Sequence, residues 1–226
     1  MAVVQIEGNL QRENILKNAY KLFKEYGYKK TTTRQIAKES GINKGLLHYY
    51  FKQKEDLIIE MYSDLLNCIN EFLSKEENCN SDAFLYYAVF NIVFFRTVSS
   101  KKYFIELLAE IVQYRNLTKL KIEKSTEMLY EFLKEHGYRD REYPLLLAVT
   151  VAVGAEAELV LSINEGKVKM TYDKLAATMN KLLFTMLKIS EKEIREIIDR
   201  AMEIADSIDI NDLLKHLETN IKWLQE

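Results

Sequence analysis

The chain has 226 residues, of which 48% are hydrophobic and 29% are charged, with a single proline and seven glycines. This composition excludes a disordered or fibrous chain, and the scarcity of helix breakers predicts long helices in an all-α fold. The net charge of −2 argues against nucleic acid, yet residues 1–54 carry eleven Lys and Arg against four Glu, so a basic N-terminal part precedes an acidic remainder.

The sequence predicts neither a membrane span nor a secretory signal. Glu156 and Glu158 interrupt the most apolar stretch, residues 145–163. The N-terminus lacks the charged-then-apolar layout of a signal peptide. Cys68 and Cys79 have no partner Cys or His pair at zinc spacing, so we expect reduced thiols in a cytoplasmic protein without a metal or cofactor.

The first predicted helix covers residues 12–26. It should end at Gly27, where a glycine in the left-handed conformation closes a helix and lets Tyr28 pack back on the last turn. Its apolar residues recur at helical spacing and form one face: Ile15, Leu16, Ala19, Leu22 and Phe23.

Two short helices are predicted next. Thr32 and Gln35 fit a capping box at the start of the first, which ends at Ser40 and Gly41, and Asn43 fits the cap of a second helix that runs to about residue 51. Two short helices joined by a glycine-containing turn form a helix-turn-helix. The side chains predicted to fill the core between these helices and the first are Ile36, Ala37, Ile42, Leu47 and Tyr50.

Three motifs in this region, TTRQIA at residues 32–37, GINKG at 41–45 and YYFKQKEDL at 49–57, resemble the N-terminal signature of TetR-type transcriptional regulators. The resemblance covers about the first quarter of the chain. It implies a three-helix DNA-binding domain over residues 1–54 and a larger helical ligand-binding and dimerisation domain over residues 55–226. It also implies a non-enzymatic homodimer that binds near-palindromic operator DNA and a small-molecule effector.

The same resemblance implies which residues meet DNA. Thr32 and Thr33 would contact phosphates on one side of the major groove, and Tyr50 with Lys54 on the other. The start of the second short helix would approach base edges with Lys44, Gly45, Leu46 and Tyr49, while Arg34 and His48 also face outward. Tyr50 also fits a core position and Arg34 a solvated one. The family often has a small polar residue at position 46 and Tyr-His at positions 48 and 49, so these positions predict no operator sequence.

A long helix from Lys54 to about Lys75 is expected to connect the two domains, and the polar segment 76–82 to form a loop after it. Residues 84–104 then contain eight aromatic side chains, on a helix that is apolar around most of its circumference and on the start of the next. Such a helix is buried, and two interpretations fit it: an ordinary aromatic core or a cavity for an apolar or aromatic ligand. The candidate ligand-binding residues are Tyr87, Phe90, Phe94, Tyr103, Phe104, Tyr114 and Glu156.

An amphipathic helix is predicted over residues 117–136, with Lys119, Lys121 and Lys124 facing outward. A helix rich in small residues follows from Pro144 to about Asn164, and another covers residues 172–189. The resemblance implies that the last two form a four-helix dimer interface, with Ala148, Ala152, Ala155, Leu159, Leu183 and Met186 as candidate contacts.

Glu156 and Glu158 lie inside this apolar run and have two interpretations. They lie at the surface, border a dimer contact or pair with a basic residue, because an unpaired buried carboxylate is costly. Alternatively, one of them faces the cavity and receives a cationic ligand.

Two further helices are predicted after Ser190, with a break near residues 206–209, where they cover the body or extend the dimer. Trp223 is expected to be a packing anchor.

Two other functions are weighed against a regulator. The sequence lacks Glu-x-x-His pairs, a phosphate-binding glycine loop and HExxH, which disfavours an enzyme. The acidic C-terminal part disfavours a DNA-packaging protein without sequence preference.

Overall fold

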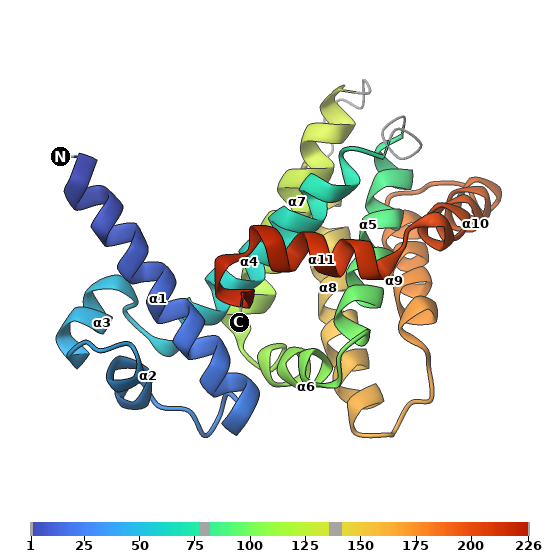
Figure 1. Ribbon diagram of the computed structural model, residues 1–226. Coiled ribbons are helices and arrows are strands. Elements are labelled where there is room, and N and C mark those ends of the chain that lie inside the picture. Colours follow the sequence, from blue (N-terminus) through green and yellow to red (C-terminus); the bar gives the residue numbers. More distant parts are fainter. Residues whose placement is uncertain (1, 77–81, 136–141, 226) are drawn as a thin grey trace. The chain divides into compact units, whose positions relative to one another are not determined.

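The computed structural model describes residues 2–76, 82–135 and 142–225, and all regular elements in these ranges are helices (Figure 1). The predicted all-α class is therefore confirmed. Two compact units are present: the first consists of Met1–Cys68 with Leu214–Glu226, and the second of Ile69–Leu213. We call the second unit the body.

The first unit contains a head of three helices, α1 (Ala2–Tyr26), α2 (Thr33–Glu39) and α3 (Lys44–Tyr50). Helix α1 begins ten residues before its predicted start and ends as predicted. Gly27 has φ 81° and donates its N–H to the carbonyl of Phe23 at 2.9 Å. Tyr28 then packs its ring 5.1 Å from that of Phe23, centroid to centroid.

Both predicted caps of the helix-turn-helix are confirmed. Thr32 accepts the N–H of Gln35, whose side chain accepts the N–H of Thr32. Asn43 accepts the N–H of Leu46 at 2.8 Å. These caps fix where the two short helices begin, although neither helix is long enough to be stable in isolation.

The core of the head is built from the apolar faces of its three helices and from Phe51, the residue after α3. Of the side chains predicted to fill it, Ile42 and Tyr50 are partly exposed. The buried residues of the three helices and of the connection to α4 include Ile15, Leu16, Ala19, Leu22, Phe23, Ile36, Ala37, Leu47 and Phe51.

The boundary between the units falls inside two helices, α4 (Lys54–Leu73) and α11 (Ile210–Asn220). The sequence expectation divided the chain after residue 54 and left the C-terminal residues in the larger domain. In the structure the last residues group with the head, because the short 3₁₀ helix η2 (Lys222–Leu224) packs against α1.

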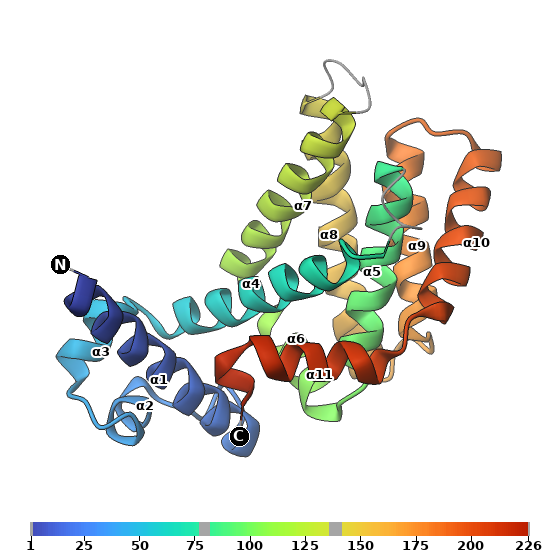
Figure 2. The ribbon, with the colours of Figure 1, turned by 45° about the horizontal axis from the view of Figure 1, so that its top comes forward.

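The body is built around α5 (Ala83–Ser99), in which every residue except Arg96 and Ser99 is buried. Helices α9 (Tyr172–Met186) and α10 (Glu191–Ser207) pack against it, as do α6 (Lys102–Ile111) and α7 (Arg115–Glu135) (Figure 2). Helix α8 (Glu142–Asn164) packs against α7 and α9. The predicted burial of the aromatic helix is confirmed.

Polar contacts fix the register of α5 against its neighbours. The Asn91 amide donates to the side-chain oxygen of Asn180 at 3.0 Å, and both residues are buried. Arg96 binds Asp173 on α9 through two nitrogens at 3.1 and 3.0 Å, and Asp206 on α10 at 2.7 Å. Because unpaired polar groups are costly inside a core, these pairs favour one arrangement of the three helices.

Candidate DNA-binding face and ligand site

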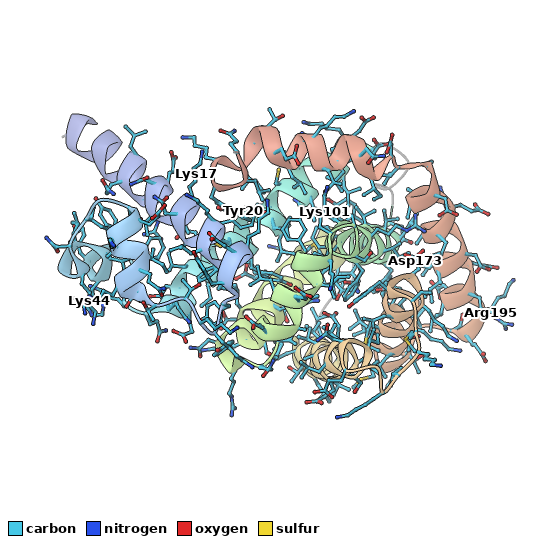
Figure 3. All side chains as sticks on the ribbon, turned by 60° about the horizontal axis from the view of Figure 1, so that its bottom comes forward. Lys17, Tyr20, Lys44, Lys101, Asp173 and Arg195 are labelled. Carbon is cyan, nitrogen blue, oxygen red and sulfur yellow. The ribbon has the colours of Figure 1, made fainter. Side chains whose placement is uncertain are left out.

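Helix α3 exposes all the side chains expected to approach base edges. Lys44, Leu46, His48 and Tyr49 face solvent, and Leu47 alone among the residues between 44 and 49 is buried. Tyr49 is 72% exposed, which is unusual for a large aromatic ring and leaves it available to a partner. Lys44 extends from the end of the head away from α1 (Figure 3).

The local structure gives a reason for a glycine at position 45, in addition to the expected close approach of a partner. A Cβ atom at this position would lie 3.2 Å from the side-chain oxygen of Asn43, which caps α3. A larger residue would therefore crowd the cap at which α3 begins.

The candidate phosphate contacts on α2 differ in how much of each side chain is available. The Thr32 hydroxyl donates to Gln35 Oε1 at 2.8 Å and accepts the Gln35 N–H at 3.2 Å, so it serves mainly the capping box. Thr33 is partly exposed and Arg34 is exposed. Arg34 and Thr33 therefore present more hydrogen-bonding capacity to a phosphate than Thr32 does.

The ammonium group of Lys54, which was expected to contact a phosphate, makes hydrogen bonds within the head. Its ammonium group donates to the carbonyls of Tyr28 at 2.7 Å and Thr31 at 3.0 Å, and it lies 3.9 Å from the centroid of the Tyr28 ring. The side chain therefore ties the start of α4 to the loop between α1 and α2. Its partners are 26 and 23 residues away in the chain, which local sequence patterns do not reveal.

Arg12 is a residue of the site that the sequence pattern missed. Its guanidinium binds the Glu60 carboxylate through Nε at 2.7 Å and through Nη2, and Nη1 donates to the carbonyl of Tyr50 at 3.1 Å. It also lies 4.4 Å from the centroid of the Phe51 ring. Because Tyr50 is the last residue of α3, Arg12 stabilises the C-terminal end of α3 with positive charge.

Tyr50 lies between the two environments that the sequence allowed, the core and the DNA-binding surface. Its side chain is partly exposed, and its ring meets that of Tyr49 edge-on at 5.4 Å. After it, the N–H of Gln53 donates to the Asp56 carboxylate at 3.0 Å. Half of a capping box thus starts α4 although Gln53 itself is a weak cap.

In the body, a buried ion pair lies among aromatic rings. Glu156 on α8 is 5% exposed and forms an ion pair with Lys121 on α7. The Lys121 ammonium lies 5.2 Å and 5.5 Å from the ring centroids of Phe94 and Phe95 on α5. The prediction that Lys121 faces outward was wrong, whereas pairing of Glu156 with a basic residue was one of the stated alternatives. Glu158 is exposed.

Tyr87 belongs to the same cluster. Burial raises the pKa of its hydroxyl, the charge of Glu156 raises it further, and a hydrogen bond with Ser125 opposes both effects. Tyr87 is therefore a neutral hydrogen-bonding group at neutral pH. The aromatic side chains of α5 thus lie beside the Lys121–Glu156 pair. The region combines apolar surface with a hydrogen-bond donor and an acceptor in fixed positions.

The remaining candidate ligand residues are distributed more widely. Phe90 is buried on α5 between Tyr87 and Phe94, at a spacing that places it on the same side of the helix. Phe104 on α6 and Tyr114 after it are partly exposed. The side chain of Tyr103 lies outside the described residues.

Half of the expected dimer contacts are not available for a partner chain. Ala148, Ala152 and Leu183 are at most 4% exposed, because they pack inside their own chain. The apolar side chains that α8 exposes are instead Leu146 (48%), Leu147 (46%) and Val151 (40%). Of the other candidates, Ala155, Leu159 and Met186 are partly exposed.

Two further searches concern classes of function that the sequence disfavoured. Within residues 2–76, 82–135 and 142–225, no group of three or more His, Cys, Asp or Glu is placed to hold a metal ion. One helical segment, Leu145–Asn164, is long and apolar enough by composition to span a membrane. It belongs to α8, which packs against α7 and α9 and carries the Glu156 ion pair.

Comparison with known proteins identifies relatives of the head. Residues 15–61 match the family model described as bacterial regulatory proteins, tetR family. The transcriptional regulator HbdR of Aromatoleum sp. is 33% identical over 66 residues, which are 29% of each chain. The negative regulator of the biofilm operon icaADBC, IcaR, of Staphylococcus epidermidis is 32% identical over 85 residues, 37% of this chain and 45% of IcaR. The chain thus matches less than half the length of these curated relatives.

Solved structures are similar over much more of the chain. RolR in complex with resorcinol superposes with a TM-score of 0.59 at 17% identity and covers 87% of this chain and 96% of its own. The repressor FadR of Thermus thermophilus in complex with lauroyl-CoA gives a TM-score of 0.57 at 18% identity over 80% and 96% of the two chains. At these identities the likeness concerns the fold, a helix-turn-helix head followed by a helical domain.

Proposed function

We propose that this chain, whose residues 15–61 match the family model of the tetR bacterial regulatory proteins, is a ligand-responsive DNA-binding transcriptional regulator. It acts in the cytoplasm as a homodimeric repressor without catalytic activity. The observation that carries the proposal is the exposed face of α3, on which Lys44, Leu46, His48 and Tyr49 project from a capped three-helix head.

The head supplies both general affinity and sequence preference. Residues 1–54 have a net charge of +7, which attracts the phosphate backbone of DNA. Helix α3 then enters the major groove, where Lys44 donates to a guanine and Leu46 contacts a thymine methyl group. Thr33, Arg34 and Tyr50 hold phosphates beside the groove.

Two heads bind one near-palindromic site because two chains pair through α8 and α9. The exposed Leu146, Leu147 and Val151 support this pairing, since one helix face carries three large apolar side chains in contact with water. Ala155, Leu159 and Met186 border the same surface. Ala148, Ala152 and Leu183 support α8 and α9 from the inside.

The effector binds in the body, next to the cluster of Tyr87, Phe94, Lys121 and Glu156. Two solved proteins of the same fold are complexes with resorcinol and with lauroyl-CoA, which supports a ligand in this domain. Because Lys121 neutralises Glu156, the cluster needs no cation, and its paired donor and acceptor suit a small, largely apolar or aromatic effector that carries a hydroxyl or carbonyl group.

Effector binding changes DNA affinity through α4, a continuous helix that begins at Lys54 in the first unit and ends in the body. A coupling free energy of about 1–3 kcal/mol is sufficient for a severalfold to hundredfold change in affinity. The effector therefore needs only a modest preference for one position of this helix in order to release the operator.

Selection of duplexes from a random-sequence library with the purified full chain tests the proposal. We expect enrichment of an inverted repeat, with two chains bound per duplex. A variant with Lys44→Ala and Tyr49→Ala should enrich nothing, since both side chains lie on the exposed face of α3. Turnover of a substrate by a chain that lacks residues 1–54 would instead favour an enzyme.

A further inference from the structure

The end of the chain is anchored to the head by its only tryptophan. Trp223, in η2, is 6% exposed, and its indole N–H donates to the Asp64 carboxylate on α4 at 2.8 Å. Its ring lies 5.1 Å from the ring of Tyr20 on α1, centroid to centroid. One side chain thus contacts both helices.

Neighbouring residues hold the same segment in place. The Lys222 ammonium binds the Glu13 carboxylate on α1 at 2.6 Å. Leu217 on α11 and Ile221 before η2 are buried, at 1% and 4% exposure. We call residues 217–225 the C-terminal latch.

The C-terminal latch contacts α1 and α4 close to the residues that hold the reading helix. Asp64, which binds Trp223, lies one helical turn after Glu60, which binds Arg12. Arg12 in turn donates to the carbonyl of Tyr50 at the end of α3. Glu13, next to Arg12, is the partner of Lys222. The C-terminal latch and the residues that hold α3 therefore use neighbouring charged side chains on α1 and α4.

We propose that the C-terminal latch is a positioning element for DNA recognition: by fastening α1 to residues 60–64 of α4, it sets the orientation of Arg12 and hence of α3. The latch makes no DNA contact in this mechanism. This inference rests on the proposed DNA-binding function, because orientation of α3 matters only if α3 reads DNA.

The C-terminal latch is held by few contacts, so the loss of one side-chain interaction should be enough to release it. Helix η2 is a single turn that follows a non-helical residue, Ile221, so side chains rather than a continuous helix hold it. Asp64 is partly buried and accepts the indole N–H of Trp223. Loss of this donor leaves a partly desolvated carboxylate near Arg12, which disturbs the Arg12–Glu60 pair.

The test compares three full-length variants and one control variant with the wild type. Trp223→Phe keeps an aromatic ring but removes the N–H donor. Asp64→Leu removes the acceptor, whereas Asp64→Asn keeps an acceptor oxygen. Glu218→Gln is the matched control, because Glu218 is exposed on the same segment and its loss removes one negative charge.

Two readouts are measured for each variant: deuterium uptake by the peptide that contains residues 44–50 without DNA, and affinity for the duplex selected by the wild type. Trp223→Phe and Asp64→Leu should take up deuterium severalfold faster and bind about tenfold more weakly, the scale of one hydrogen bond to a charged group. The salt dependence of binding should not change, because no phosphate contact is lost. Asp64→Asn and Glu218→Gln should resemble the wild type.

Each result decides between a positioning and a purely structural role. If Trp223→Phe lowers only the unfolding midpoint, with uptake and affinity unchanged, the latch is a structural anchor and the inference is wrong. If Trp223→Phe does not fold, the contrast between Asp64→Asn and Asp64→Leu decides. If the wild type selects no duplex, the proposed DNA-binding function fails, and deuterium uptake alone tells whether the latch controls α3.

Discussion

At the residue scale, the structure separates lysines that the sequence could not distinguish. Lys44 is exposed on α3, whereas the ammonium group of Lys54 is held by the carbonyls of Tyr28 and Thr31. Both were predicted to contact DNA from their places in the motif. Exposure of Lys44 followed from local helix periodicity, but the fixation of Lys54 depends on a loop more than twenty residues earlier.

Lys54→Ala should therefore destabilise the head instead of removing a phosphate contact. Two backbone carbonyls lose a charged donor, which we expect to cost about 1–3 kcal/mol in the free energy of unfolding. The salt dependence of DNA binding should stay that of the wild type. Chemical denaturation and binding at several salt concentrations measure the two quantities, with the exposed Lys52→Ala as control.

Lys44→Ala should act differently. It should relax the preference at one base position, at a cost of about 1–3 kcal/mol for the preferred base, because we propose that the side chain donates to a base edge. Stability should not change, since the side chain is exposed. A loss that is equal for every duplex would show that Lys44 contacts only phosphate.

Asp64 gives the first unit a pH dependence of known sign. Burial raises the pKa of Asp64 above its usual value of 3.8, against the hydrogen bond from Trp223 and the charge of Arg12, which lower it. The folded state then binds the proton more tightly than the unfolded state, so this carboxyl costs stability as the pH rises from 3.8 through the raised pKa.

Asp64→Asn removes that titration. The stability of the wild type relative to Asp64→Asn should fall as the pH rises through this window, and should be constant above it. Urea unfolding of both proteins at a series of pH values measures the difference. A relative stability that increases with pH would mean that the pKa of Asp64 is lowered in the folded protein.

At the element scale, the caps of the helices in the head were predictable, whereas the inner and outer faces of α8 were not. The caps at Thr32, Asn43 and Gly27 are local devices and were found in the sequence. Helix α8, in contrast, is apolar around most of its circumference, so periodicity does not distinguish its inner face from its outer one. Of its small residues, Ala148 and Ala152 face inward, where they allow close packing within the chain.

The Lys121–Glu156 ion pair between α7 and α8 should affect the free energy of unfolding as a buried pair does. Lys121→Met or Glu156→Gln alone leaves its partner without its counter-ion, and we expect each to cost about 3–5 kcal/mol for a fully buried charge. The double variant Lys121→Met/Glu156→Leu should recover most of this loss. Thermal and urea unfolding of all three proteins measure the coupling.

A matched control lies on the same helix. Lys124 and Glu127 on α7 form an exposed pair at 2.9 Å, and its loss should cost at most about 1 kcal/mol. If the single changes in the buried pair cost no more than this, water reaches the Lys121–Glu156 pair and the cluster is not a dry site.

At the scale of the whole molecule, the fold class and the head could be predicted because their signals are local. The grouping of the C-terminal residues with the head could not, since Trp223 and its partner Asp64 are 159 residues apart. The choice between an aromatic core and a ligand site also depends on tertiary packing. Only the tertiary structure reveals that Lys121 pairs with Glu156 beside Phe94 and Phe95, and the proposed effector site is placed at this pair.

The exposed face of α8 should control assembly. Leu147→Glu places a charge on the proposed contact between two chains, so we expect a monomer in sedimentation experiments and loss of high-affinity DNA binding. The control is Arg195→Glu on the exposed side of α10, which should remain dimeric (Figure 3). A Leu147→Glu protein that stays dimeric would place the interface elsewhere.

The central claim is that the exposed face of α3 reads base sequence. Its most direct test is the ratio of wild-type affinities for the selected duplex and for a shuffled duplex of the same length and composition at one salt concentration. We expect a ratio of about 10³ or more, as for specific DNA-binding proteins. A ratio near one would contradict the claim and indicate a protein that binds DNA without regard to its sequence.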